Sequence, residues 1–123
     1  MTNPFRDQEK FMRACDQTVD NFNFKQFALY GALINEEVTE LKEAVNNNDQ
    51  VETLDALIDI LVVTIGAIHS LGADAEGAWK EVMSTNFAKI DSETGKVRKR
   101  EDGKVLKPLG WKGPELTQFL NKE

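Results

Sequence analysis

The stretch "DALIDILVVTIGAIHSLG", residues 55–72, decides the fold of this 123-residue chain. After Asp59 its apolar residues point in every direction around a helix, and a helix that is apolar all round must be covered all round. Asp55 and Asp59 stand one helical turn apart at the head of this run. Because burying a carboxylate costs on the order of several kcal/mol without compensation, the two aspartates need a partner.

The composition is that of one soluble globular domain, with 29% charged and 41% hydrophobic residues. The net charge of -6 disfavours a nucleic-acid partner, because phosphate backbones bind basic surfaces. The start of the chain does not read as a signal peptide, and no apolar run is long enough to span a bilayer. The single cysteine, Cys15, suits a reducing compartment. We expect a cytoplasmic protein without a membrane partner.

Capping residues and helical periodicity predict four helices, over about residues 4–19, 25–45, 50–71 and 75–89. From Asp91 onward the chain is basic and rich in turn residues, with at most a short β-hairpin. We therefore expect an all-α, four-helix-bundle-like single domain, 1–123, with the bundle over about 4–89 and an irregular basic tail or lid over about 90–123. Short helices cannot cover the apolar third helix alone, so we also expect a homo-oligomer, either a dimer or a tetramer.

The second predicted helix carries the acidic stretch "EEVTE", residues 36–40. At about 100° per residue, Glu37 falls inside the apolar stripe of this helix and Glu40 falls at its edge. Glu36 lies outside the stripe, where a plain surface role remains an alternative.

The third predicted helix carries Glu52, Asp55 and Asp59 within an arc of about 60°. The short "NNNDQ" connection favours antiparallel packing of the second and third helices, which brings their acids face to face. No Arg or Lys stands at the same helical positions, and carboxylate oxygens suit Mg²⁺ or, alternatively, Mn²⁺. Glu52 is equally explained as the N3 residue of a capping box that starts at Asp49.

The segments "EEVTELKEA" and "VETLDALIDILVVTIGAIHSLG" resemble the MazG-like all-α nucleotide pyrophosphohydrolases, and most of all their small single-domain, often phage-encoded members. That superfamily includes phosphoribosyl-ATP pyrophosphohydrolase, dimeric dUTPase and dCTP pyrophosphatase. "EVMSTNFAKID" and "DGKVLKP" extend the resemblance over about residues 27–115. It implies hydrolysis of a nucleoside triphosphate between Pα and Pβ, which gives the monophosphate and pyrophosphate.

The family signature is EExxE on one helix and ExxD on the next, and the first part matches "EEVTE" directly. In one register Glu52 and Asp55 supply ExxD. In the other, set by "ILVVTIGA", Asp59 takes the Asp position and Ala56 stands where the Glu would be. Both registers remain open.

The resemblance implies roles for individual side chains. The expected metal ligands are Glu37, Glu40, Asp55 and Asp59, with Glu52 as the weaker candidate. Glu36 and Glu37 are the expected catalytic residues, and Glu36 would position or deprotonate the attacking water. The expected substrate-binding residues are Asn86 and Lys89, which match the family's Asn and Lys, then Lys104 and Lys107 for phosphates, and the aromatics Phe24 and Trp111. Trp111 is equally explained as a packing anchor for the tail, and Phe24 as a core residue.

The predicted function is thus metal-dependent hydrolysis of a (d)NTP. Among the bases we favour a purine, as in (d)GTP, although no side chain identifies a base edge. The alternatives are a catalytically impaired metal- or nucleotide-binding regulatory module and a purely structural helical oligomer.

Overall fold

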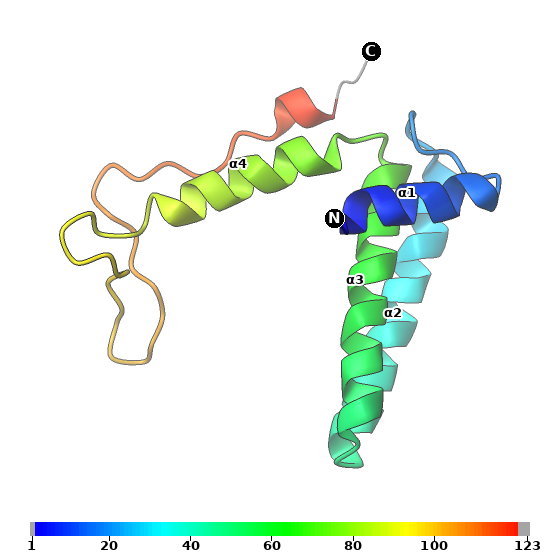
Figure 1. Cartoon of the computed structure of the whole chain (residues 1–123), viewed down its shortest axis with the longest axis horizontal. Coiled ribbons are helices and arrows are strands. Elements are labelled where there is room, and N and C mark those ends of the chain that lie inside the picture. The colour runs from blue at the N-terminus through cyan, green and yellow to red at the C-terminus, as the bar shows by residue number, and fades with distance from the viewer. Residues whose placement is uncertain (1, 121–123) are drawn as a thin grey trace.

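The computed structural model describes residues 2–120, and the all-α prediction is confirmed for that part of the chain (Figure 1). Within this part, four α-helices and one short 3₁₀ helix follow one another: α1 Pro4–Ala14, α2 Phe24–Asn46, α3 Gln50–Ser70, α4 Ala75–Phe87 and η1 Thr117–Phe119. Between residues 2 and 120 there is no β-strand; two isolated antiparallel bridges, Ile90–Val97 and Lys99–Val105, close turns in the tail.

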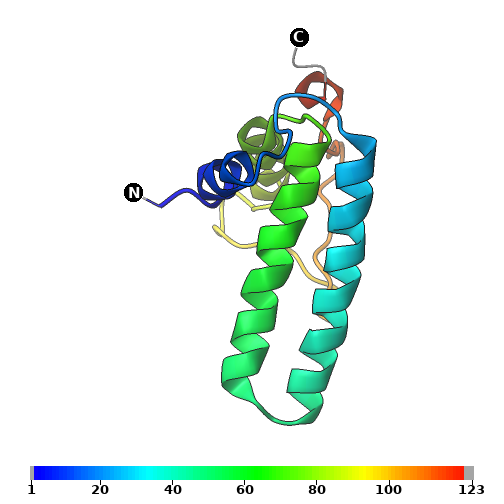
Figure 2. The same cartoon turned by 90° about the vertical axis from the view of Figure 1, so that its right-hand side faces the viewer.

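The central unit is the antiparallel hairpin of α2 and α3, which lie side by side in both views (Figures 1 and 2). Its connection is short because Asn48 adopts a left-handed backbone with φ of 55°. Asp49 then caps α3, as predicted, by accepting the backbone N–H of Glu52 at 3.0 Å.

A close contact between Tyr30 of α2 and Gly66 of α3 fixes how the two helices pack. A side chain at Gly66 would collide with the Tyr30 ring, so glycine is what allows the tyrosine to lie against α3. Tyr30 is buried, and its hydroxyl donates to Gln17 Oε1 at 2.6 Å. Around it gathers the core, which includes Met12, Val19 and Ala67.

The first helix is shorter than the sequence predicted. It ends at Ala14 rather than near Val19, because Asp16 takes a left-handed conformation with φ of 58° directly after the Cys15 cap. Val19 is nevertheless 97% buried, since the loop after α1 folds back and carries it into the core. Its apolar character was a correct signal of burial, although not of helix.

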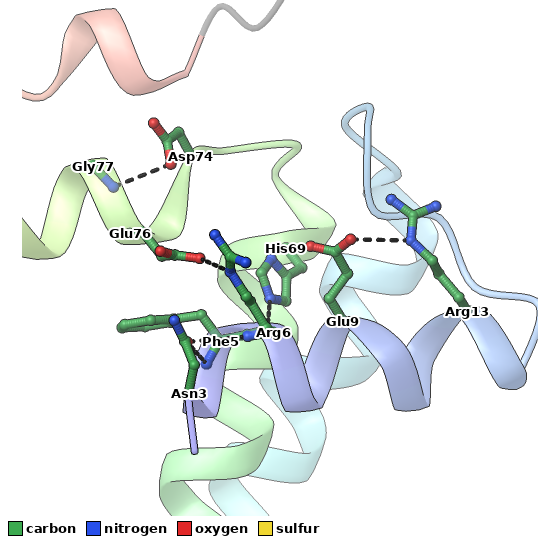
Figure 3. Close-up of polar contacts among 9 residues, drawn as sticks. All are labelled: Asn3, Phe5, Arg6, Glu9, Arg13, His69, Asp74, Glu76 and Gly77. Carbon is green, nitrogen blue, oxygen red and sulfur yellow. Dashed lines mark hydrogen bonds and ion pairs between the residues drawn. The ribbon is translucent and has the colours of Figure 1, made fainter. Parts of the chain in front are cut away.

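The fourth helix leaves the hairpin instead of lying along it, and the chain direction turns by 113° between α3 and α4. Gly72 makes this corner with φ of 72°, where a side chain would meet the backbone of Asn21. Helix α1 lies beside this corner (Figure 3). The Phe5 ring packs against the Trp79 ring in a tilted orientation, with the ring centroids 6.0 Å apart. The Phe5 carbonyl oxygen accepts from His69 Nε2 at 2.8 Å.

The C-terminal segment runs back along α4 (Figure 1). Trp111 Nε1 donates to the Thr85 carbonyl oxygen at 2.7 Å, and further along the Glu115 backbone N–H donates to Glu81 Oε2 at 2.9 Å. The Phe119 carbonyl oxygen finally accepts from the backbone N–H of Asp74 at 2.8 Å. Helix α4 and residues 88–120 therefore form one extension, which we call the α4 arm.

Helix α3 has a large apolar face that no part of residues 2–120 covers. Leu54 is 61% exposed and Ile58 is 51% exposed, and the same face includes Leu57 and Leu61. Among these residues no single helix is both long and apolar enough to cross a membrane, although α3 and α4 pass that test of length and composition as a bent pair.

Candidate active site

The contact between Tyr30 and Gly66 brings two of the predicted ligands to the same height. Glu37 lies two helical turns beyond Tyr30 on α2, and Asp59 lies two turns before Gly66 on α3. Because the helices are antiparallel, Glu37 and Asp59 meet along the seam between them. Both side chains are half-buried, whereas Glu36 is exposed, as the helical projection predicted.

Glu37 has one carboxylate oxygen that is shielded from solvent. Its Oε2 atom is buried and has no hydrogen-bond partner. Burial raises the pKa of the Glu37 carboxyl, and a hydrogen bond with Glu40 and the charges of Glu40, Asp59 and Asp55 raise it further. All of these influences act against a negative charge at Glu37, and either a bound proton or a bound cation would relieve them.

Asp59, on α3, is affected by burial and by neighbouring carboxylates in the same way as Glu37. Burial raises its pKa, followed by the charges of Asp55 and Glu40 and a hydrogen bond with Asp55. Two pairs of carboxylates, one on each helix, therefore face each other across the seam. No ion pair within residues 2–120 joins any of them to an Arg or Lys.

An acidic hollow of about 430 Å³ opens beside Glu40 and Asp55, toward the end of the hairpin, and does not include Glu37 or Asp59. Its lining residues are Glu40, Glu43, Ala44, Asn47, Asp49, Glu52, Asp55 and Ala56. Glu43 and Asp49 were not among the predicted site residues. Glu43 follows Glu40 at a spacing of three, which places both on one side of α2. This spacing is the sequence feature that could have indicated Glu43 as a site residue.

The hollow also bears on the alternative explanation of Glu52. The cap of α3 needs only the Asp49 side chain, which accepts from the Glu52 backbone. The Asp49 backbone N–H donates instead to the Ala44 carbonyl oxygen at 3.0 Å. No reciprocal bond of a capping box thus engages the Glu52 carboxylate, and it lies in the lining of the hollow.

The acids fit a hard divalent cation by their chemistry rather than as a finished cage. Within residues 2–120 no three Asp, Glu, His or Cys side chains are close enough to enclose a metal ion as they stand. The donors are nevertheless all carboxylate oxygens, which Mg²⁺ and Mn²⁺ prefer. The buried, unpartnered oxygen of Glu37 is the atom that a cation would satisfy.

Four of the predicted substrate-binding residues come together at the far end of the α4 arm. Lys89 Nζ donates to Asn86 Oδ1 at 3.1 Å and lies 4.9 Å from the centroid of the Trp111 ring. Lys107 Nζ lies 4.8 Å from the same ring. Since the Trp111 indole N–H is bonded to Thr85, the packing-anchor explanation of Trp111 holds in this conformation.

The structure does not bring Lys104 and Phe24 to either group. Lys104 closes an exposed turn, where its backbone N–H donates to Asp102 Oδ1 at 3.0 Å. Phe24 is 73% exposed and packs edge-on against Phe22 at the start of α2, so it is not a core residue. Along α2 it stands about 20 Å from Glu37.

A comparison with known protein families gave a match. The sequence model of phosphoribosyl-ATP pyrophosphohydrolase matches residues 6–86, more than half of the chain. The match includes the α2–α3 hairpin with all of its carboxylates and ends before Lys89, Lys107 and Trp111. A comparison with curated proteins gave no match. The chain therefore belongs to the phosphoribosyl-ATP pyrophosphohydrolase family, within the MazG-like all-α nucleotide pyrophosphohydrolases.

Proposed function

We propose that this protein is a metal-dependent pyrophosphohydrolase that cleaves a nucleoside triphosphate between Pα and Pβ. The observation that supports this most is the buried Glu37 oxygen, which has no partner and is surrounded by further carboxylates. Family membership supplies the reaction class, pyrophosphohydrolysis.

In this proposal Glu37, Glu40, Asp55 and Asp59 hold the divalent cation, with Glu52 at the border of the site. When bound, Mg²⁺ or Mn²⁺ neutralises the phosphates and favours attack by water at Pα. Glu36 is exposed next to Glu37, where its carboxylate can orient the attacking water or accept its proton. Asn86 and Lys89, with Lys107, provide the donors for the phosphate chain.

We further infer that the complete site forms between two copies of the chain. The carboxylates lie on the α2–α3 hairpin and the paired lysines at the far end of the α4 arm, which points away from that hairpin (Figure 1). The uncovered apolar face of α3 is a surface on which a second copy would pack. A dimer or tetramer would set an arm of one copy over the hairpin of another.

The base and the compartment also remain part of the proposal. Phe24 is exposed and free to stack on a base, and a purine such as (d)GTP is the first nucleotide to test. The corresponding location is the cytoplasm, where nucleoside triphosphates are available.

A substrate panel tests this function. The protein is incubated with canonical and modified (d)NTPs in the presence of Mg²⁺ or Mn²⁺, and the monophosphate and pyrophosphate are quantified. We expect both products from at least one nucleotide and their loss in Asp59→Asn. Glu101→Gln is the matched control, because Glu101 is an exposed acid of the α4 arm outside the proposed site. Metal binding without turnover of any nucleotide would instead indicate a binding module.

A further inference from the structure

The arrangement of two lysines around one tryptophan at the end of the α4 arm is more than tail packing requires. A single hydrogen bond, from Trp111 Nε1 to the Thr85 carbonyl oxygen, already ties the ring to α4. The two ammonium groups approach the ring from different segments, Lys89 from just after α4 and Lys107 from the tail. They repel each other, and the ring attracts both of them.

Neither ammonium group has a carboxylate partner among residues 2–120. The nearby acid Asp91 pairs with Arg98 at 3.6 Å and accepts backbone N–H groups of Glu93 and Thr94. It is therefore already occupied. Both lysines line a hollow of about 580 Å³, whose other charged lining residues are Arg98, Asp91 and Glu93.

Lys89 and Lys107 lie against an aromatic ring and not against a carboxylate, and this affects how they can bind a phosphate. A carboxylate would neutralise a lysine and occupy its N–H donors, so that it would compete with a phosphate. The face of an indole attracts the cation while leaving its net charge and most of its donors free. Lys89 gives one N–H to Asn86, and Lys107 has no side-chain hydrogen bond among residues 2–120.

We propose that Trp111 is a positioning residue, which holds Lys89 and Lys107 as a charged pair for the phosphate chain of the substrate. This inference rests on the proposed function and extends it to a residue outside the part of the chain that matches the family. Two cations around one ring suit a chain of phosphates better than a single phosphate group. The arm should thus bind a polyphosphate in preference to a monophosphate.

Binding can be measured separately from hydrolysis with inorganic tripolyphosphate in the absence of divalent metal. In a Trp79→Phe background Trp111 is the only remaining tryptophan, and its emission reports directly on the ring. We expect a saturable change in emission with tripolyphosphate and a much weaker response to inorganic phosphate. Lys89→Ala and Lys107→Ala should each weaken the response, whereas Lys112→Ala, next to the ring, should leave it unchanged.

Substitutions of Trp111 separate positioning from anchoring. Trp111→Phe keeps a ring but loses the bond to Thr85, and Trp111→Leu loses both. If the ring positions the lysines, Trp111→Leu should weaken tripolyphosphate binding, measured by calorimetry, by roughly tenfold and Trp111→Phe by roughly threefold. For a hydrolysed nucleotide the same series should raise KM and leave kcat unchanged.

Two results would overturn the inference. If Trp111→Leu binds tripolyphosphate as tightly as the unmodified protein, the ring does not position the lysines. If Trp111→Phe is as impaired as Trp111→Leu, the anchoring bond to Thr85 is what matters. Either result leaves the proposed hydrolysis intact, and an absence of hydrolysis in the substrate panel would leave the tripolyphosphate result intact.

Discussion

The α2–α3 hairpin and the α4 arm place their acidic side chains in opposite environments. On the arm, Asp102 accepts from Arg100 and Asp91 accepts from two backbone N–H groups, and these contacts lower the pKa of each acid. In the hairpin, Glu37 and Asp59 face other carboxylates and their pKa values are raised. The arm gives Asp91 and Asp102 hydrogen-bond donors, whereas the hairpin leaves its carboxylates without an Arg or Lys partner among residues 2–120. On this difference rests the proposal that the hairpin binds a cation.

The largest expected effect comes from neutralising the hairpin. In Glu37→Gln, a proposed metal ligand and a repelling charge disappear together. We expect turnover to fall by roughly 100-fold or more, while the metal-free protein melts at a higher temperature. Steady-state kinetics and thermal melting measure the two changes. A variant that lost activity and also stability in the metal-free state would show that Glu37 has a structural partner instead.

The second effect concerns the packing that places the acids opposite each other. Gly66→Ala puts a methyl group against the Tyr30 ring and should lower the free energy of unfolding by about 1–3 kcal/mol. Gly31→Ala is the control, because nothing lies within 4 Å of a side chain added there. In a helix that change should stabilise by about 0.5–1 kcal/mol. Denaturant titration measures the free energy of unfolding of both variants. Equal values would contradict the close contact between Tyr30 and Gly66.

The two regions should also respond oppositely to pH. Carboxyls with raised pKa values hold their protons more tightly in the folded state, so their contribution to stability is present at low pH. It is lost as pH rises through their raised pKa values. Asp91 and Asp102, with lowered pKa values, contribute above the ordinary carboxyl range and lose that contribution as pH falls.

Thermal melting of the metal-free protein and of Asp59→Asn, between acidic and neutral pH, tests this. The difference between the two proteins gives the contribution of Asp59 to the pH dependence of stability. The unmodified protein should lose more stability than Asp59→Asn as pH rises. An identical pH dependence in the two proteins would mean that Asp59 is not under charge repulsion.

The smallest expected effect is at the corner between the two regions. Arg6 Nε and Glu76 Oε1 lie 3.0 Å apart (Figure 3), but the Arg6 side chain is 75% exposed and solvent screens the pair. Glu76→Gln should therefore change the melting temperature only slightly, by less than Gly66→Ala. A loss larger than that of Gly66→Ala would show that the ion pair itself sets the direction of the arm.

Local rules were enough to predict much of the hairpin from the sequence. Asp49 and Gly72 delimit α3 because capping depends on neighbouring residues alone, and helical periodicity separated the half-buried Glu37 from the exposed Glu36. The family resemblance suggested Asn86 and Lys89 as a pair, and they are hydrogen-bonded to each other.

Features that depend on tertiary contacts were not predictable in this way. The early end of α1 rests on the left-handed backbone of Asp16, a residue type that tolerates that conformation without requiring it. The course of the tail depends on where Trp111 finds an acceptor, which is a carbonyl 26 residues away. The role of Glu43 in the acidic hollow depends on how closely the ends of α2 and α3 approach each other.

The central claim is that a divalent cation supplies the charge that the α2–α3 hairpin lacks. Thermal melting at neutral pH, with and without Mg²⁺ or Mn²⁺ in excess, tests it most directly. We predict that the metal raises the melting temperature of the unmodified protein and of Glu101→Gln, and that Asp59→Asn and Glu37→Gln lose most of this increase. A melting temperature that is the same with and without metal, or an equal increase in all four proteins, would contradict the claim.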